Sequence, residues 1–519
     1  MKKNKLLMLL PISLASVFAL SGCGQEEETK VLRILNCEDY IYEYEEGDEE
    51  YAADKYDYQM DLVDQFIAYW AETHNGEKIE IVYDTFDTNE TMFNELQTGK
   101  TTYDVIVPSD YMVQKLLSND MLEKFDEDKL DGLWENISPY LKDKFEGIKA
   151  GDESIYNYSI PYMWGTVGVM YNPEYYKDLD ENRVHELFSD WDSLYKEELR
   201  GSFSIKDSVR DTYAVSLIHK FRKDISEITD NAELTSKFNR SDAYTMSKVK
   251  DDMLKLKENA FGFECDSGKT DMTTQKIGAN MCWSGDATWA ITEAEEFELT
   301  LYYSIPTTYF GVDDDGNDIV IENGGASNVW FDGFCMPKSE DLHKDLAQEF
   351  IKFMSQPENA AQNCYCVGYT PGVAGDAMLD YMYDCYDIRG EVGGEIDPSW
   401  VEGKDYSWYD LSYFFNGSLS EEYENVHAAK LMASQEYVGR QLTAQYPSAE
   451  ILDRLAIMND FGPEGNARLL DMWEQVRTNA LPVWGIIVLT VEVLAGIALA
   501  AYLISHKVNR KRFKKARHN

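Results

Sequence analysis

Hydrophobic and polar residues follow two different periods along the N-terminal part of the chain. Short runs rich in β-branched and aromatic residues predict strands at Val31–Leu35, Lys78–Phe86 and Tyr103–Val107. Between them, apolar residues at helical spacing predict helices over Met60–Trp70 and from Asp87 onward. Because strands and helices alternate in this order, the pattern predicts an α/β fold with a parallel, doubly wound sheet.

Acidic residues near two predicted helix starts have a structural explanation. Glu90 lies three residues after Asp87, which is a capping-box pattern. We therefore expect Glu90 to cap its helix rather than to contact a ligand. Asp286 precedes a segment that could form a helix from Ala287, so a capping role is one interpretation of this aspartate as well.

The boundaries of larger units are visible in the same pattern. A strand predicted to open at Gly165–Tyr171 places the start of a second lobe near Tyr162. The stretch Tyr42–Tyr58 is very acidic and rich in tyrosine. Such a composition favours an inserted surface loop over a part of the core.

The N-terminus has the pattern of a targeting segment. Lysines precede an apolar stretch, Leu6–Leu20, that is short for a membrane span. The stretch ends in Leu20-Ser21-Gly22-Cys23, which resembles the lipobox of bacterial lipoproteins. The resemblance implies that residues 1–22 are a signal peptide and that Cys23 becomes the lipidated first residue.

A second apolar run, Leu481–Ile504, is about long enough to cross a bilayer as a helix. The basic tail 505–519 follows at once, so the positive-inside rule places the C-terminus in the cytoplasm. We therefore expect a protein of the cell membrane whose large middle part is extracytoplasmic, either periplasmic or at the cell surface.

Composition excludes several classes of function. The net charge of −46 repels nucleic acid and concentrates cations, although a solubility surface explains the bulk charge equally well. The chain lacks a phosphate-binding loop of the GxxxxGK type, so it should not hydrolyse nucleotide. Its eight cysteines and seven histidines form no metal-binding motif, and we expect neither a metal nor another cofactor.

The candidate chemistry lies in pairs of acidic and aromatic residues. If Trp330 and Asp332 lie on one strand, both point to the same side. A carboxylate beside an aromatic wall suits an organic ammonium ion, since the acid neutralises the charge and the ring adds cation–π attraction. Each residue also has a plainer explanation, because a tryptophan such as Trp283 usually belongs to a core and a pair such as Asp39-Tyr40 to a solvated loop.

Several short motifs, taken together and in order, resemble the substrate-binding proteins of bacterial spermidine/putrescine ABC transporters. The similarity covers roughly residues 31–465. The motifs are Thr88-Asn89-Glu90-Thr91-Met92, Tyr103-Asp104-Val105-Ile106-Val107-Pro108-Ser109, Ser159-Ile160-Pro161-Tyr162-Met163-Trp164-Gly165, Trp283-Ser284-Gly285-Asp286, Trp330-Phe331-Asp332 and Gly368-Tyr369-Thr370-Pro371.

The resemblance implies a two-lobed periplasmic-binding-protein (type II) fold, in which crossing strands join two α/β lobes around the ligand. Each lobe would be a doubly wound sheet, and a C-terminal transmembrane helix would be added here. The implied division is a signal peptide at 1–22, lobe 1 at 23–161 and 331–373, lobe 2 at 162–330 and 374–478, the membrane helix at 481–504 and the tail at 505–519.

Ligand-binding positions of the family can be carried over residue by residue. The positions that match are Asp39, Tyr40, Ser109, Tyr111, Asp211, Trp283, Asp286, Trp330, Asp332 and Tyr369. Three positions depart from the family pattern: Cys37 replaces a ring, Ser208 an acid of the spermidine-binding branch, and Met458 a glutamine of the same branch. The departures at Ser208 and Met458, together with Asp286, favour putrescine or another diamine.

These observations predict an extracytoplasmic polyamine-binding component of an ABC importer, which closes its lobes on the ligand and delivers it to a permease and its ATPase. We expect no enzymatic activity. The alternatives are a receptor of the same fold for another small solute, such as a sugar or a thiamine-like cation, a glycosidase using two carboxylates, and a sensor that signals through a partner.

Overall fold

The computed structural model describes residues 29–44, 60–130, 132–313, 315–391, 393–424 and 429–478. The predicted signal peptide, the lipidation site Cys23, the apolar run 481–504 and the basic tail 505–519 all lie outside these residues. Within the described part, no helix has the length and apolar character that a membrane span requires.

One lobe is built around a three-stranded parallel sheet with the order β2-β1-β3. Its first elements are β1 (Lys30–Cys37), α1 (Leu62–Thr73), β2 (Ile79–Phe86), α2 (Asn89–Thr98) and β3 (Val105–Ile106). The β-α-β-α-β order predicted from the sequence is therefore confirmed. Helix α3 (Asp110–Ser118) follows directly after β3.

The start of α2 differs from the prediction by one residue. Thr88 is the N-cap, its hydroxyl accepts from the Thr91 amide, and the Thr91 hydroxyl accepts from the Thr88 amide. The capping box thus consists of two threonines, and the prediction that Glu90 caps the helix is wrong. Threonine can replace the usual glutamate at the third helical position because its hydroxyl also reaches the N-cap amide.

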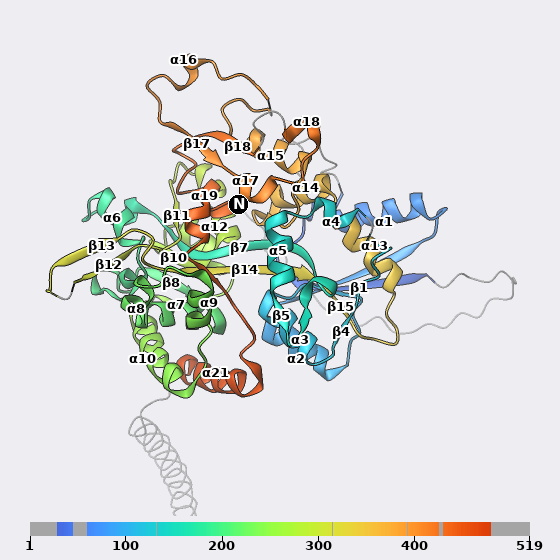
Figure 1. Cartoon of the computed structure of the whole chain (residues 1–519), viewed down its shortest axis with the longest axis horizontal. Helices are drawn as coiled ribbons and strands as arrows, with labels where there is room; N and C mark the ends of the chain where they lie inside the picture. Colours follow the sequence, from blue (N-terminus) through green and yellow to red (C-terminus); the bar gives the residue numbers. More distant parts are fainter. Residues whose placement is uncertain are drawn as a thin grey trace, which may run out of the picture.

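Two long antiparallel strands connect the lobes (Figure 1). They are β7 (Ile160–Tyr171) and β14 (Ser327–Phe334), and every residue of both is buried. The sequence analysis placed a strand only from Gly165, because residues 161–164, which precede it, do not alternate between polar and apolar side chains. The register between the two strands shifts at Asp332/Gly333, which marks a β-bulge.

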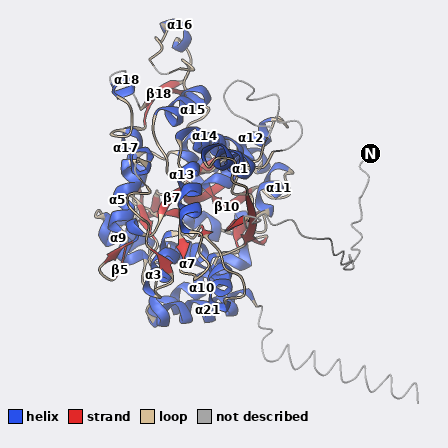
Figure 2. Cartoon of the chain, turned by 90° about the vertical axis from the view of Figure 1, so that its right-hand side faces the viewer, coloured by secondary structure: helices blue, strands red, loops and turns tan. Residues whose placement is uncertain are grey.

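The second lobe extends the same sheet in the order β19-β14-β7-β10-β8-β9. Its strands are β8 (Phe203–Lys206), β9 (Gly262–Glu264), β10 (Ala279–Trp283) and β19 (Leu455–Ile457). Strands β8, β9 and β10 run parallel to one another. The helices α7 (Val209–Lys220), α10 (Ala243–Asn259), α11 (Ser267–Thr273), α12 (Ser284–Glu295) and α21 (Gly462–Arg477) belong to this lobe. Figure 2 shows the strands in the interior with helices around them.

A further group of elements lies above the crossing strands in Figure 1. It contains α15 (Asp376–Tyr386), β17 (Tyr406–Asp410), α17 (Ser412–Phe415), β18 (Lys430–Ser434) and α19 (Gln441–Gln445). The ring of Phe414 stacks on Trp164 of β7 at 5.7 Å. The Ser138 hydroxyl donates to the Phe414 carbonyl at 2.7 Å. The division of the chain into two lobes at the stated residue numbers stays a prediction.

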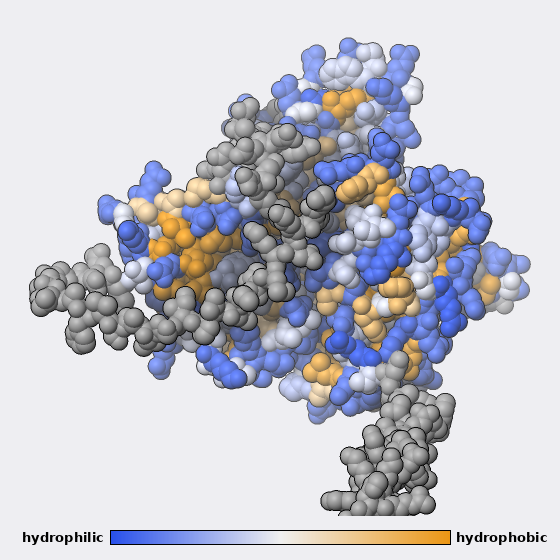
Figure 3. Space-filling view, turned by 180° about the vertical axis from the view of Figure 1, so that it is seen from behind, coloured by the Kyte–Doolittle hydropathy of each residue, from blue (hydrophilic) through white to orange (hydrophobic). Residues whose placement is uncertain are grey.

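Of the predicted acidic surface loop Tyr42–Tyr58, the structure describes only residues 42–44. Residues 45–59 lie outside the described part, but Tyr42 is buried and its amide donates to Asn363 Oδ1 at 2.9 Å. The assignment of Tyr42 to a surface loop is therefore wrong, because the chain after β1 first turns inward. On the face seen in Figure 3, hydrophilic residues cover most of the surface, as the large net charge leads one to expect.

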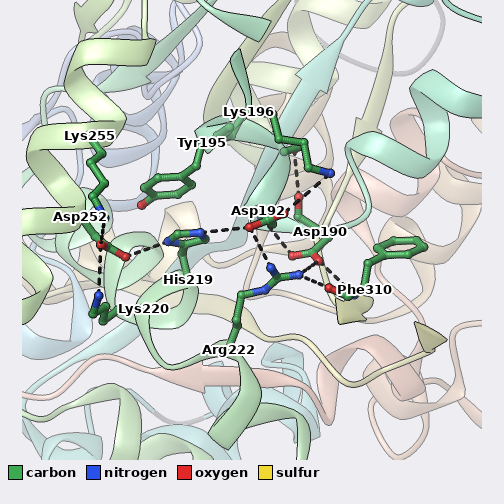
Figure 4. Close-up of polar contacts among 12 residues, drawn as sticks. Asp190, Asp192, Tyr195, Lys196, His219, Lys220, Arg222, Asp252, Lys255 and Phe310 are labelled. Atoms are coloured by element: carbon green, nitrogen blue, oxygen red, sulfur yellow. Dashed lines mark hydrogen bonds and ion pairs between the residues drawn. The ribbon is translucent and has the colours of Figure 1, made fainter. Parts of the chain in front are cut away.

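A partly buried ionic network ties α7 to its neighbours in the second lobe (Figure 4). His219 Nδ1 lies 2.8 Å from Asp252 Oδ2, and His219 Nε2 lies 3.2 Å from Asp192 Oδ1. The His219 ring also stacks on Tyr195 at 3.5 Å. Since carboxylates only accept hydrogen bonds, both ring nitrogens are satisfied only in the imidazolium form. Burial opposes this charge, but the bonds to Asp192 and Asp252 outweigh it and raise the pKa of His219.

This arrangement makes stability depend on pH. A histidine with a raised pKa in the folded state stabilises the fold fully below its unfolded pKa of about 6.5, and this contribution is lost as the pH rises through the folded pKa. We expect His219→Gln to lower the free energy of unfolding by about 1.5–3 kcal/mol at pH 6, the range for a hydrogen bond to a charged group, and by less at pH 9.

Denaturant unfolding of the full-length protein and the variant at both pH values measures this difference. His74→Gln, at the end of α1 in the other lobe, serves as the matched control. An equal loss of stability at both pH values for His219→Gln would show that the imidazolium contributes nothing.

Candidate functional site

A cavity of about 120 Å³ lies between the lobes, where the carboxyl ends of both sets of parallel strands face each other. Open α/β sheets bind ligands at this edge because the loops after the strands converge there. All ten residues that the sequence predicts as ligand-binding line this cavity. The structure thus brings them together, while their role in binding stays a prediction.

The first lobe contributes the loops and helix starts after β1, β2 and β3. Tyr40 follows β1, and Glu90 lies in the first turn of α2. Ser109 is the N-cap of α3 and Tyr111 lies in its first turn. The Tyr111 hydroxyl donates to Glu90 Oε1 at 3.2 Å, so Glu90 faces the cavity. Burial raises the pKa of Glu90, against the opposing charge of Arg210.

The second lobe contributes the corresponding positions after β8 and β10. Lys206 ends β8, and Asp211 lies in the first turn of α7. Trp283 ends β10, and Asp286 lies in the first turn of α12, whose N-cap is Trp283. The capping interpretation of Asp286 is therefore wrong. Trp283 Nε1 donates to Asp211 Oδ2 at 3.1 Å, which fixes the indole ring beside this carboxyl.

Trp330 and Asp332 project from the crossing strand β14 into the cavity, as the alternation of side chains along a strand predicts. The Tyr40 hydroxyl donates to Asp332 Oδ2 at 2.8 Å. Asp332 Oδ1 is buried and accepts no hydrogen bond of good geometry from the described residues. Burial raises the pKa of Asp332 to about 6, although the nearby hydroxyls of Ser109 and Tyr40 favour the ionised form.

Aromatic rings connect the two acidic ends of the cavity. The Tyr369 ring lies 4.8 Å from Tyr40 and 5.9 Å from Trp330. The Tyr369 hydroxyl donates to Asp286 Oδ1 at 2.7 Å. This ring position requires glycine at 285, since a Cβ there would lie 2.1 Å from the Tyr369 ring. The motif Trp-Ser-Gly-Asp therefore supplies both the acid, Asp286, and the space that Gly285 leaves for the Tyr369 ring.

Asp39 has a different environment from the other predicted acids. It has a positive φ of 52°, and its side chain is 70% exposed. Its carboxylate pairs with Lys269 of α11 at 3.3 Å, so the pair joins the two lobes at the edge of the cavity. The three departures from the family pattern, Cys37, Ser208 and Met458, also line the cavity.

Several charged residues that line the cavity were missed by the sequence reasoning, and four of them are Glu90, Asp110, Lys206 and Arg210. Their shared signal is position, because each lies at the carboxyl end of a strand or in the helix turn that follows it. The cations were missed for a chemical reason, since a site for ammonium ions gives no reason to expect lysine or arginine.

The cavity is suited to an organic cation. Carboxyl groups at several points can neutralise ammonium groups, and the rings of Tyr40, Trp330 and Tyr369 can cover apolar spacers between them. Among the described residues, no group of three or more histidine, cysteine, aspartate or glutamate side chains is placed to hold a metal ion.

Comparisons with known proteins agree with this architecture. The chain is 27% identical over 437 residues to the putrescine-binding periplasmic protein SpuD of Pseudomonas aeruginosa, covering 81% of this chain and 98% of that protein. It is 25% identical over 304 residues to the spermidine/putrescine-binding periplasmic protein of Escherichia coli, covering 58% and 73%.

Solved structures share the fold. A putative spermidine/putrescine ABC transporter protein from Listeria monocytogenes matches with a TM-score of 0.55 and 22% identity, over 87% of this chain and 99% of that chain. The substrate-binding protein PotD from Streptococcus pneumoniae matches with a TM-score of 0.52 and 23% identity, over 86% and 99%. The two-lobed periplasmic-binding-protein fold predicted from the sequence is thus confirmed.

The profile of a family described as bacterial extracellular solute-binding protein matches residues 62–377, which is more than half of the chain. The match includes both crossing strands and most of the residues that line the cavity. This chain therefore belongs to the bacterial extracellular solute-binding proteins, and it is a binding protein rather than an enzyme.

Proposed function

We propose that this chain is the extracytoplasmic polyamine-binding component of an ABC importer and that it delivers a putrescine- or spermidine-type ligand to a permease. One observation carries the proposal: Asp332 is a buried carboxyl with a free oxygen, and it lies beside Trp330 and Tyr40 in the cavity between the lobes. A buried carboxylate without a cation is costly, and an organic ammonium ion would neutralise it. The named relatives, which are putrescine- and spermidine-binding proteins, support the same ligand class.

The ligand-binding residues follow from the cavity. Asp332 would neutralise one ammonium group, and Asp211 lies in the same cavity with its carboxyl held by Trp283. Trp330, Tyr40 and Tyr369 would cover the methylene groups between the charges. Closure of the two lobes about β7 and β14 would then enclose the ligand and form the surface that the permease and its ATPase recognise.

Removal of the Asp332 charge tests the proposal most directly. We expect full-length protein to bind putrescine in isothermal titration calorimetry and Asp332→Asn to weaken this binding about 100-fold or more, because loss of one partner of a buried charge pair costs about 3–5 kcal/mol. Asp271→Asn removes one negative charge outside the cavity and should leave the dissociation constant unchanged.

The outcomes separate the alternatives. If a neutral sugar gives a heat of binding and the Asp332→Asn variant gives the same heat, the alternative of a receptor for another solute is favoured. Absence of binding to any di- or triamine by the folded wild-type protein would remove the proposal.

The raised pKa of Asp332 predicts a pH dependence of binding. An ammonium group binds the ionised carboxylate, and a carboxyl with a pKa of about 6 is ionised to about one tenth at pH 5 and almost fully at pH 7. The apparent dissociation constant for putrescine should therefore be about tenfold higher at pH 5 than at pH 7.

The dissociation constants come from titrations in buffers of equal ionic strength. In Asp332→Asn the residual binding should vary much less over this range. A wild-type dissociation constant that stays constant from pH 7 to pH 5 would contradict the assignment of Asp332 as the ammonium partner.

Membrane attachment is the second part of the proposal and rests on sequence alone. A lipid on Cys23 and a helix over Leu481–Ile504 would hold the binding protein beside its permease at high effective concentration, with the C-terminus in the cytoplasm.

We expect a fatty-acid analogue to label the wild-type chain in cells. The Cys23→Ser variant should lose this label, but the variant protein should stay in the membrane fraction because the C-terminal helix still anchors it. Cys23→Ser combined with deletion after Asn479 should be released into the soluble fraction. Release of the single variant Cys23→Ser would show that the C-terminal run does not anchor the protein.

A further inference from the structure

The cavity contains a lysine that the polyamine-binding role does not require. Lys206, the last residue of β8, is 1% exposed and lines the cavity beside Trp283 and Asp286. A cation buried in a site for cations is unexpected, because it repels the ligand unless acids cancel its charge.

The Lys206 ammonium makes the contacts that a ligand ammonium would make. Its Nζ lies 2.8 Å from Asp286 Oδ2 and 3.2 Å from Glu264 Oε1. It also lies 4.3 Å from the centre of the Trp283 ring and donates to the Cys265 carbonyl. Two acids, a carbonyl oxygen and an aromatic face are the partners that a desolvated alkylammonium group needs.

Both carboxylate oxygens of Asp286 are already hydrogen-bonded in this arrangement. Its Oδ2 accepts from Lys206 and its Oδ1 accepts from the Tyr369 hydroxyl. Burial opposes charge on both members of the pair, yet Asp286 raises the pKa of Lys206 and Lys206 lowers the pKa of Asp286, so the ion pair persists. By contrast, Asp332 keeps a free oxygen at the far side of Tyr369 and Tyr40.

We infer that Lys206 occupies one ammonium position of the binding cavity as a built-in cation, so that the ligand is an amine with no more than two cationic groups. This inference rests on the proposed polyamine function. A triamine such as spermidine needs a third acid for its additional charge, and Asp286, the member of the acid pair Asp286 and Glu264 that lines the cavity, is already paired with Lys206. Of the other buried acids of the cavity, Glu90 is offset by the charge of Arg210, and burial raises the pKa of Asp110 well above its usual range. A short diamine needs only two partners, and Asp332 and Asp211 supply them.

Removal of the lysine charge should make Asp286 and Glu264 available to an ammonium group of the ligand. We expect Lys206→Met in the full-length protein to lower the ratio of the spermidine to the putrescine dissociation constant at least tenfold, as measured by isothermal titration calorimetry. The reason is that Asp286 and Glu264 then lack a cation, and the additional ammonium group of spermidine can replace it. The wild-type protein should bind putrescine at least tenfold more tightly than spermidine.

The chain offers a close control for a buried lysine. Lys237 pairs with Asp224 at 2.7 Å, lies 5.1 Å from the Phe221 ring, and its side chain is 12% exposed, but it does not line the cavity. Lys237→Met should leave the ratio of the two dissociation constants unchanged. If Lys206→Met does not fold, Lys206→Met combined with Glu264→Gln removes one unpaired charge and should change the ratio in the same direction.

The possible results have distinct meanings. Wild-type protein that binds spermidine as tightly as putrescine overturns the inference and leaves the polyamine function intact. An unchanged ratio in a folded Lys206 variant also overturns it. If neither the wild-type protein nor a folded variant binds any amine, the proposed function itself fails.

Discussion

The cost of burying charge governs the cavity between the lobes. A carboxyl that is buried there is removed from water and must be neutralised, hydrogen-bonded or protonated. At Asp286 the protein itself supplies the partners, because Lys206 and Tyr369 each donate a hydrogen bond to one carboxylate oxygen. It does not do so at Asp332, which keeps a free oxygen and has a pKa raised to about 6. The difference between these two acids supports our proposal that a cation from outside binds at Asp332.

The fold brings these groups together by a simple rule of α/β architecture. Parallel strands in both lobes end at the same edge, and the helices that follow start there. Tyr111, Asp211 and Asp286 each lie in the first turn of such a helix. The crossing strand β14 then places Trp330 and Asp332 between the two edges. Residues that are far apart in the sequence therefore line one cavity without any long ordered loop.

The sequence was sufficient to predict the parts of this structure that depend on the spacing of hydrophobic residues and on family motifs. The order of strands and helices in the first lobe follows from periodicity, and all ten proposed ligand positions line the cavity. Contacts between distant residues could not be predicted in this way. The capping box uses Thr91 in place of Glu90, and Tyr42 packs against Asn363, which is more than three hundred residues away. Lys206 could not be recognised because its meaning depends on Glu264 and Asp286, which reach it only in the folded chain.

The β-bulge at Asp332/Gly333 lies in one of the two strands that connect the lobes. A bulge interrupts the ladder of hydrogen bonds and bends the strand that carries it. In β14 this bend adjoins the buried carboxyl of Asp332, which has a free oxygen. Any change in the course of this connecting strand would therefore also displace the acid that we propose as the partner of the ligand.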